Sequence, residues 1–334
     1  MRIAVDLMGG DRGAADLIPA ATRCLSEFAD LEVIMVGDQS LIESVLAASA
    51  TTRSRVRIEG SDDVVEMTDR PSMALRQRRG SSMFRAVELV RDGEADACVS
   101  TGNTGALMAI GRHLLKTVPG IDRPAIIKAI PSTRGKCYLL DLGANINCDA
   151  ENLIQFAAMG SLMCGAVEGI ERPSVGLLNI GEEEMKGEGS VLTAAQLLKE
   201  LKGINFIGFV EGDGIYQSDA DVLVCDGMVG NIALKTSEGL ARFVASMIED
   251  AFRENFVTRA AGIVAGPVLL RLKAELSPEN YNGATLLGLS RVVVKSHGDS
   301  STDGFYAAIR EAMRCVEQDI PGLLKRRLDD VLAS

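Results

Sequence analysis

Short runs rich in valine and isoleucine recur along the chain, and most are separated by stretches with the apolar spacing of a helix. The runs that predict strands are 2–8, 31–37, 55–60, 97–101, 125–130, 137–143, 174–181, 204–210, 222–226 and 291–297. The stretches that predict helices include 15–28, 82–92, 104–117, 151–168, 191–202, 230–252 and 302–318. Near-continuous apolar strands that alternate with helices are typical of a mostly parallel sheet covered on both faces. The pattern therefore predicts an α/β/α layered fold.

Two regions modify this simple alternation. The strands predicted at 125–130 and 137–143 are joined by Pro131 to Lys136 alone, which is too short for a parallel crossover. This pair should be an antiparallel hairpin, which makes the sheet mixed. Residues 239–276 carry no strand pattern and predict a helical protrusion from the sheet. No linker or low-complexity run divides the chain, so residues 1–334 are predicted to form a single catalytic unit.

Seven of the apolar runs pass directly into a glycine-rich polar loop. These transitions occupy 5–11, 99–105, 139–145, 178–184, 209–214, 224–231 and 294–299. In open α/β sheets the ligand lies outside the carboxyl ends of parallel strands, where glycines let backbone N–H groups approach an anion. We therefore expect the seven loops to meet at one edge of the sheet and to form the active site of an enzyme.

Composition narrows the class of protein. The net charge of -11 argues against broad nucleic-acid binding, which requires a basic surface. Seven scattered cysteines without a CxxC pair predict buried free thiols in a reducing cytosol. Asp6 interrupts the first apolar run, so a signal peptide is not predicted, and no run approaches the ~20 apolar residues of a membrane span. The sequence predicts a cytoplasmic protein and leaves peripheral contact with a membrane open.

Several common catalytic motifs are absent from the sequence. There is no GxxxxGK loop or GxSxG elbow, and Gly212-Asp213-Gly214 lacks the third glycine of a dinucleotide turn. With His113 and His297 as the only histidines, a histidine metal cluster is excluded. We therefore predict neither a metal nor an organic cofactor, and exclude P-loop kinases, serine hydrolases of the elbow type and zinc enzymes.

The loops that remain carry amides, hydroxyls and cations. The turn from Gly102 to Gly105 opens a helix, where free N–H groups and hydroxyls bind anions, although ordinary helix capping explains it equally well. Lys235 follows Asn231 by one helical turn, and His297 lies beside Lys295 at a strand end. Together these loops describe a cleft suited to phosphate, without an activated side-chain nucleophile.

Longer blocks of the sequence resemble one known family. They are Met8–Asp11, Ser72–Arg76, Gly102–Met108, Leu140–Asn145, Asn179–Glu183, Cys225–Gly227 with Gly230–Asn231, and His297–Gly298. In this order, from the first strand to Ala308, they resemble the bacterial phosphate acyltransferase family PlsX. One departure is Arg12-Gly13-Ala14, where the family usually continues with a His-Ala-Pro-like stretch; Arg12 would then replace a histidine as the local cation.

The resemblance implies transfer of a fatty acyl chain from acyl carrier protein to inorganic phosphate, giving an acyl phosphate for phospholipid synthesis. It also implies a fold related to phosphate acetyltransferases and isocitrate/isopropylmalate dehydrogenases, a homodimer, peripheral membrane association and a downstream acyltransferase that consumes the acyl phosphate. Hydrogen phosphate is already a dianion near pH 7 and a thiolate leaves readily. The protein must therefore align the reactants and stabilise the oxyanion rather than form a covalent intermediate.

With this reaction in view, the candidate residues fall into two groups. The proposed catalytic residues are Asn103, Lys186, Asp226, Lys235 and His297. The proposed phosphate- and substrate-binding residues are Asp6, Asp11, Gly102, Thr104, Gly105, Asp141, Asn145, Glu183, Asn231 and Lys295. The Gly102–Gly105 turn would bind phosphate or the oxyanion, the lysines would supply positive charge, and the acids would orient them. His297 would protonate the departing thiolate or steer phosphate.

Two surface segments complete the expectations. Five arginines without an intervening acid predict a docking patch for an acidic carrier protein, with a solvated helix face as the alternative: Arg70, Arg76, Arg78, Arg79 and Arg85. In the uncharged run 260–270 the predicted membrane contacts are Ile263, Val264, Val268 and Leu269. Packing against a partner subunit or the chain's own core would explain that run equally well.

Three other functions remain open from the sequence alone. A phosphate acetyltransferase would use a coenzyme A thioester on the same fold. A decarboxylating dehydrogenase would require a metal and a nicotinamide cofactor. A lipid-sensing scaffold would bind membranes without turnover.

Overall fold

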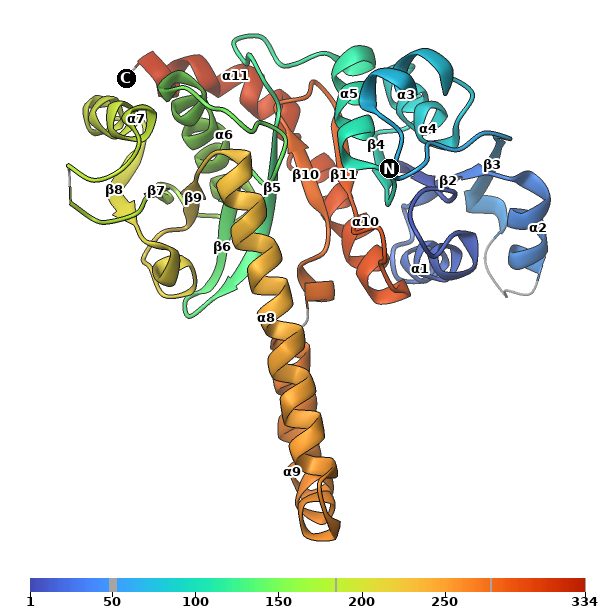
Figure 1. The fold of residues 1–334 in the computed structure, drawn as a ribbon. Helices are drawn as coiled ribbons and strands as arrows, with labels where there is room; N and C mark the ends of the chain where they lie inside the picture. Colours follow the sequence, from blue (N-terminus) through green and yellow to red (C-terminus); the bar gives the residue numbers. More distant parts are fainter. Residues whose placement is uncertain (48–52, 184, 277, 334) are drawn as a thin grey trace.

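One mixed sheet organises the computed structural model, which describes residues 1–47, 53–183, 185–276 and 278–333 (Figure 1). Within these residues eleven strands lie in the order β3-β2-β1-β4-β11-β10-β5-β6-β9-β7-β8. Their bounds are β1 Arg2–Asp6, β2 Glu32–Gly37, β3 Val56–Gly60, β4 Ala97–Ser100, β5 Ala125–Ser132, β6 Gly135–Leu140, β7 Ser174–Leu178, β8 Asn205–Val210, β9 Val222–Val224, β10 Ala284–Leu287 and β11 Val292–Lys295. Each of the ten predicted strands is present, and the short β10 is an addition.

The sheet consists of two halves whose strands run in opposite directions. β1 pairs in parallel with β2 and β4, and β4 with β11. β10 is antiparallel to both β11 and β5, and β5 forms the predicted antiparallel hairpin with β6. β9, β7 and β8 then continue in parallel with β6. The carboxyl ends of β1, β4 and β11 therefore lie at one edge of the sheet, and those of β6, β7, β8 and β9 lie at the other.

Helices cover both faces, but the two faces differ. On one face a single apolar core joins both halves of the sheet. On the other face the core divides in two, and Met108 packs against both parts. Alternating residues of each strand supply the two faces, as in a sheet that is buried on both sides. The divided core leaves room for a site above the central strands.

The helices that cover the continuous core are α1 Ala14–Glu27, α2 Gln39–Ala47, α6 Ala150–Glu168, α7 Gly189–Glu200, α10 Thr302–Glu317 and α11 Ile320–Ala333. Those on the divided face are α3 Pro71–Gln77, α4 Ser82–Arg91, α5 Thr104–Leu115 and the first part of α8 Gly227–Arg253. The remaining elements are α9 Phe256–Leu276 and the short 3₁₀ helices η1 Arg53–Arg55, η2 Gly212–Tyr216 and η3 Pro278–Tyr281. All seven predicted helices are present.

α8 and α9 form a hairpin that projects far from the sheet, which confirms the predicted helical protrusion (Figure 1). The turn between them places Phe256 and Val257 at the tip, where they are 85% and 74% exposed. The run 260–270 was expected to form this tip, but it lies along the side of α9. Ile263, Val264 and Val268 are exposed there, whereas Leu269 is half-buried. No helix in the described ranges is long and apolar enough to cross a bilayer.

All seven cysteines are free thiols, in agreement with the sequence prediction. Six are buried and Cys148 is half-buried. Burial raises the pKa of Cys24 and of Cys148 to about 12, so these thiols stay protonated near neutral pH. The cysteines are therefore core residues rather than nucleophiles.

Candidate active site

Three glycine-rich loops meet at the carboxyl ends of β1, β4 and β11. The backbone N–H of Asp11 donates to the carbonyl of Gly298 at 2.9 Å, and the Thr101 hydroxyl donates to the carbonyl of Gly9 at 2.5 Å. A Cβ atom on Gly9 would lie 2.8 Å from the backbone nitrogen of Gly102, so only glycine permits this approach. The predicted convergence is confirmed for these three loops.

Asp6 fixes the shape of this loop cluster. Its carboxylate is completely buried and accepts hydrogen bonds from the hydroxyls of Ser82 at 2.7 Å and Ser100 at 2.6 Å. It also accepts from the backbone N–H groups of Met8 and Gly9 at 3.2 Å each. Every one of these partners holds a loop in place. The geometry gives Asp6 a positioning task rather than direct contact with a ligand.

Lys295 lies beneath the loops as a buried cation. Its Nζ donates to the carbonyl of Thr101 at 3.1 Å and also contacts the carbonyl of Ser296. Burial, and then the nearby ammonium of Lys235, lower the pKa of Lys295 to about 8. Asp6 and Asp11 counteract this shift, yet neither pairs directly with the ammonium. Lys295 therefore places positive charge under the loop edge and titrates close to physiological pH.

α8 crosses the divided face and brings further charges to the same edge. Lys235 Nζ lies 3.2 Å from His297 Nε2 and 2.9 Å from a carboxylate oxygen of Glu238. Glu238 also pairs with Lys128 of β5 at 3.3 Å, and both of these residues are buried. We call Lys128, Lys235, Glu238, Lys295 and His297 the lysine–histidine cluster. It holds three lysines against one carboxylate, so it attracts an anion.

The protonation states in this cluster follow first from burial and then from the neighbouring charges. Burial and then Lys235 lower the pKa of His297, so the imidazole is neutral at pH 7 and accepts from the Lys235 ammonium. Burial lowers the pKa of Lys128, although Glu238 counteracts the effect. Burial would raise the pKa of Glu238, but Lys128 and Lys235 outweigh it and the carboxylate stays charged. Arg12, the expected histidine replacement, pairs with Asp299 at 2.7 Å on the exposed surface.

Lys128 and Glu238 were missed in the sequence. Lys128 offered a signal, because it is the single charge inside the otherwise apolar run 125–130. Glu238 offered none, since its helical segment carries other charged residues and its partner is 110 positions away.

The other loops lie at the opposite edge, so the expectation of one shared edge is wrong. Asp141 is buried after β6 and accepts from the N–H groups of Ile126 at 2.8 Å and Asn145 at 2.7 Å. Burial raises the pKa of Asp141, which these donors partly oppose. The β5–β6 hairpin reverses the direction of every later strand of that half. Asn145 and Asn231 also lie at this opposite edge. Asn145 is next to Gly227, and Asn231 is next to Gly143.

Asp226 and Asn103, both expected to be catalytic, begin helices. Asp226 caps α8 by accepting from the N–H groups of Met228 at 2.8 Å and Val229 at 2.9 Å. Asn103 caps α5 by accepting from Ala106 N at 2.9 Å, while its amide nitrogen donates to the carbonyls of Met67 and Asp69. The geometry explains both residues as structural caps.

Lys186 and Glu183 are separate from the lysine–histidine cluster. They form an exposed ion pair with each other at 2.8 Å, in the loop after β7. β7 lies five strands from β11 in the sheet, or about 24 Å at the usual strand spacing, and the loop is at the opposite edge.

A cavity of about 600 Å³ lies on the divided face and joins the two halves of the sheet. Thr104 and Gly105 of α5 line it on one side, and Gly143 and Ala144 after β6 line it on the other. The two groups of loops therefore face one space, although they stand at opposite edges.

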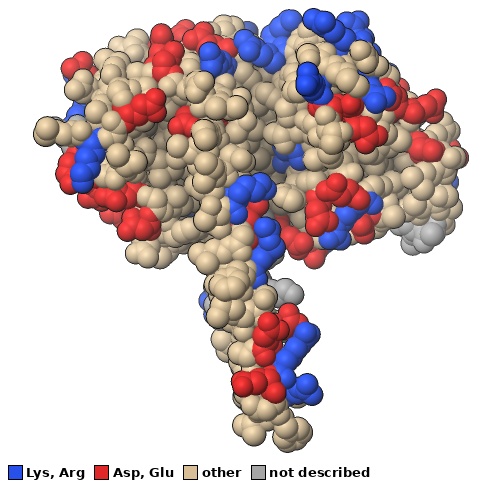
Figure 2. Space-filling view, viewed as in Figure 1, with Lys and Arg blue, Asp and Glu red and all other residues tan. Residues whose placement is uncertain are grey.

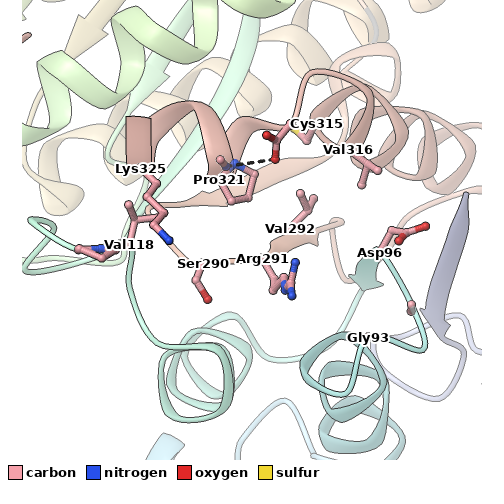
Figure 3. A pocket seen from close by; sticks show the side chains of 14 residues that line it. Gly93, Asp96, Val118, Ser290, Arg291, Val292, Cys315, Val316, Pro321 and Lys325 are labelled. Atoms are coloured by element: carbon pink, nitrogen blue, oxygen red, sulfur yellow. Dashed lines mark hydrogen bonds between the residues drawn. The ribbon is translucent and has the colours of Figure 1, made fainter. Parts of the chain in front are cut away.

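A larger cavity of about 680 Å³ lies between the starts of β4 and β11 and the α10–α11 junction (Figure 3). Arg291 and Lys325 line it, and Val292 marks the amino end of β11, away from His297. None of the candidate catalytic residues lines this cavity, so we do not place the reaction there.

The arginine-rich segment is only partly free to bind a partner. Arg78 pairs with Asp63 at 2.8 Å and Asp69 at 3.2 Å, and Arg85 pairs with Glu59 at 2.8 Å. The exposed side chains of Arg70, Arg76 and Arg79 have no ion pair among the described residues. Figure 2 shows basic residues gathered at the upper edge of the view, over α3 and α5.

Comparisons with known proteins identify the family. A family model described as a fatty acid synthesis protein matches residues 1–322. A Pseudomonas putida protein named phosphate acyltransferase is 52% identical over 331 residues, which cover 99% of this chain and 98% of the relative. A Pseudomonas fluorescens protein of the same name is 51% identical, and the match again covers 99% of this chain and 98% of the relative. This chain belongs to the phosphate acyltransferase family. It is an enzyme and an acyltransferase.

Solved structures confirm the fold class. A phosphotransacetylase from Streptococcus pyogenes has a TM-score of 0.60 at 18% identity, covering 96% of this chain and 94% of its own. A 4-hydroxythreonine-4-phosphate dehydrogenase from Klebsiella pneumoniae has a TM-score of 0.56 at 15% identity. The match covers 95% of this chain and 99% of the dehydrogenase. At such identities the likeness establishes the α/β/α architecture shared with these enzymes and nothing about substrate.

Proposed function

We propose that this acyltransferase moves a fatty acyl group from acyl carrier protein to inorganic phosphate and so supplies acyl phosphate for phospholipid synthesis. The observation that carries the proposal is the lysine–histidine cluster beside three glycine-rich loops. It offers cations and backbone donors for an anion. Six of the cysteines, which would be the natural nucleophiles for a thioester, are buried, and burial raises the pKa of the half-buried Cys148 to about 12. In this proposal phosphate, rather than a cysteine side chain, attacks the thioester.

In the proposed reaction, an oxygen of hydrogen phosphate attacks the thioester carbonyl. The new C–O bond forms, the C–S bond breaks, and the proton of hydrogen phosphate ends on the departing thiolate. Lys235 and Lys295 hold the phosphate, and the Lys235–His297 pair relays the proton. The first N–H groups of α5, at Thr104 and Gly105, stabilise the oxyanion at the positive helix end. Alignment of the two reactants alone contributes roughly 7–11 kcal/mol to lowering the barrier.

The proposed reaction is tested by trapping its product. The enzyme is incubated with palmitoylated carrier protein and phosphate, and acyl phosphate is captured as the hydroxamate with hydroxylamine. Hydroxamate should form only when both phosphate and enzyme are present. A parallel sample with acetyl-coenzyme A tests the phosphate acetyltransferase alternative and should give little product. Thiol release that is independent of phosphate would contradict the proposal.

The carrier protein docks, in our proposal, on the arginines in and beside α3 that form no ion pair among the described residues, namely Arg70, Arg76 and Arg79. Carrier proteins are acidic, and a complementary patch mainly raises the association rate. The double variant Arg76→Glu and Arg79→Glu should raise the KM for acylated carrier protein about tenfold at low salt, with less effect at high salt. The control is Arg327→Glu at an exposed position of α11, which should leave the KM unchanged. An equal KM in the patch variant and in wild type would remove the docking site.

The projecting hairpin supports the remaining expectations about partners. Exposed apolar side chains recur along α8 at helical spacing, at Leu240, Phe243, Val244, Met247 and Ile248. Such a stripe suits a second copy of the chain, and we propose a homodimer formed through it. The exposed tip with Phe256 and Val257 suits peripheral membrane contact of a cytoplasmic enzyme, next to an acyltransferase that consumes the acyl phosphate.

Both halves of the sheet supply site residues. Lys295 ends β11 and His297 follows it, whereas Lys235 comes from the helix that begins after β9. Residues 1–334 therefore act, in this proposal, as a single catalytic unit.

A further inference from the structure

A narrow cavity of about 290 Å³ runs between α8 and strand β5. Its walls are largely apolar, with Ile130 and Pro131 on one side and Leu234, Ala241 and Val244 of α8 on the other. Tyr216 of η2 and Tyr281 of η3 complete the lining together with Lys128, Ser237, Glu238 and Leu240. We call this cavity the α8 groove.

The inner end of the α8 groove touches the lysine–histidine cluster. Glu238 lines the groove and accepts from Lys235, whose ammonium contacts His297. Asn282, directly after Tyr281, accepts from the backbone N–H of His297 at 3.1 Å. The inner end of the α8 groove is therefore separated from His297 only by the side chain of Lys235.

The charges in the groove do not oppose an apolar occupant. Lys128 and Glu238 are the charged lining residues, both are buried, and they pair with each other at 3.3 Å. A hydrocarbon that covers them leaves no single charge without a partner. At the outer end Leu240 and Val244 are 59% and 38% exposed, so the groove opens towards the projecting hairpin.

We propose that the α8 groove holds the hydrocarbon chain of the thioester substrate and sets the preferred chain length. This proposal rests on the function proposed above. The thioester carbonyl lies at the inner end beside Lys235 and His297, and the methyl end lies near Leu240 and Val244. Each methylene buried in the groove should improve kcat/KM about fourfold until the groove is filled.

The variant Ala241→Phe tests this assignment by narrowing the groove from α8. Activity is measured with butyryl and palmitoyl thioesters of the same carrier protein. For the palmitoyl substrate, kcat/KM should fall at least tenfold, whereas for the butyryl substrate it should stay within twofold of wild type. The control is Ser246→Phe, which adds the same ring at an exposed position 140° further around α8, away from the lining residues.

A second variant, Leu240→Ala, guards against misfolding, because it changes an exposed side chain at the outer end. It should weaken turnover of palmitoyl but not of octanoyl substrate. Equal losses for both lengths in either variant, or no loss in both, would overturn the groove assignment. Because Leu240 and Val244 also belong to the proposed dimer stripe, loss of dimer mass in light scattering together with equal losses would assign them to the dimer interface alone and would likewise overturn the groove assignment. If wild type forms no acyl phosphate from any thioester, the proposed function fails instead.

Discussion

At the scale of single residues, the account depends on how several cations share a small space. Lys235 lies near His297 and Lys295, and the carboxylate that pairs with it, Glu238, also serves Lys128. Burial, and then this crowding of cations, favours the neutral forms, which is why the pKa values of His297 and Lys295 are lowered. A bound phosphate dianion would relieve the crowding. The cluster is thus incomplete without an anion.

The lowered pKa of Lys295 predicts a pH dependence. A lysine is charged below its pKa, so the ammonium that attracts phosphate is lost as pH rises through about 8. For phosphate, kcat/KM should therefore decline above that pH. Lys295→Arg keeps the charge to much higher pH and should remove the decline. The measurement is the pH profile between 6 and 9.5; an unchanged alkaline limb in the arginine variant would assign the titration to another group.

Residue types could be predicted from the sequence, but their partners could not. Lys295 and His297 stand out because polar groups follow an apolar strand directly. The pairing of Lys128 with Glu238 depends on α8 crossing β5, which no local pattern specifies. The same limit explains Arg78 and Arg85, whose acidic partners precede or follow the arginine-rich segment.

At the scale of elements, the first residues of a helix are of the same types as the residues of an anion-binding loop. Aspartate and asparagine favour the N-cap for the same reason that they favour anion sites and turns: a short polar side chain beside free N–H groups. Asp226 and Asn103 follow strands and open helices, so their sequence context fits both readings. In the structure both side chains accept the hydrogen bonds of a helix cap, and their catalytic role stays a prediction.

Capping by Asp226 predicts how its variants behave. Asp226→Ala should lower the free energy of unfolding by about 1 kcal/mol, whereas Asp226→Ser retains a capping oxygen and most of that stability. Thermal unfolding followed by circular dichroism measures both. Turnover of the serine variant should stay within about twofold of wild type. A stable serine variant that loses turnover a hundredfold would return Asp226 to the chemistry.

At the scale of the whole molecule, the strand positions and the antiparallel β5–β6 pair were predicted from the sequence, but the direction of the strands that follow β6 was not. All ten predicted strands and the β5–β6 hairpin are present. The hairpin reverses the second half, so loops after β6, β7, β8 and β9 leave the opposite edge. The four-residue β10 was too short to show a pattern, although it joins the halves.

The shape of the molecule also predicts membrane binding through the tip of the α8–α9 hairpin. Phe256→Ser together with Val257→Ser should reduce cosedimentation with phospholipid vesicles at least tenfold, because each exposed apolar side chain contributes roughly 1.5–3 kcal/mol when buried. Turnover of carrier-bound substrate in solution should be unaffected. Ile207→Ser, at an exposed position on β8, is the control. Equal vesicle binding by wild type and tip variant would exclude the tip as an anchor.

The central claim is that phosphate reacts at the edge formed by β1, β4 and β11. The KM for phosphate in Lys235→Ala and Lys186→Ala tests it most directly, because Lys235 contacts His297 beside the β11 loop, whereas Lys186 lies in the loop after β7 at the opposite edge. The account predicts a rise of about tenfold or more in Lys235→Ala, from the loss of a partly buried charge contact, and no change in Lys186→Ala. The reverse pattern would contradict the account and move the reaction to the β7 loop.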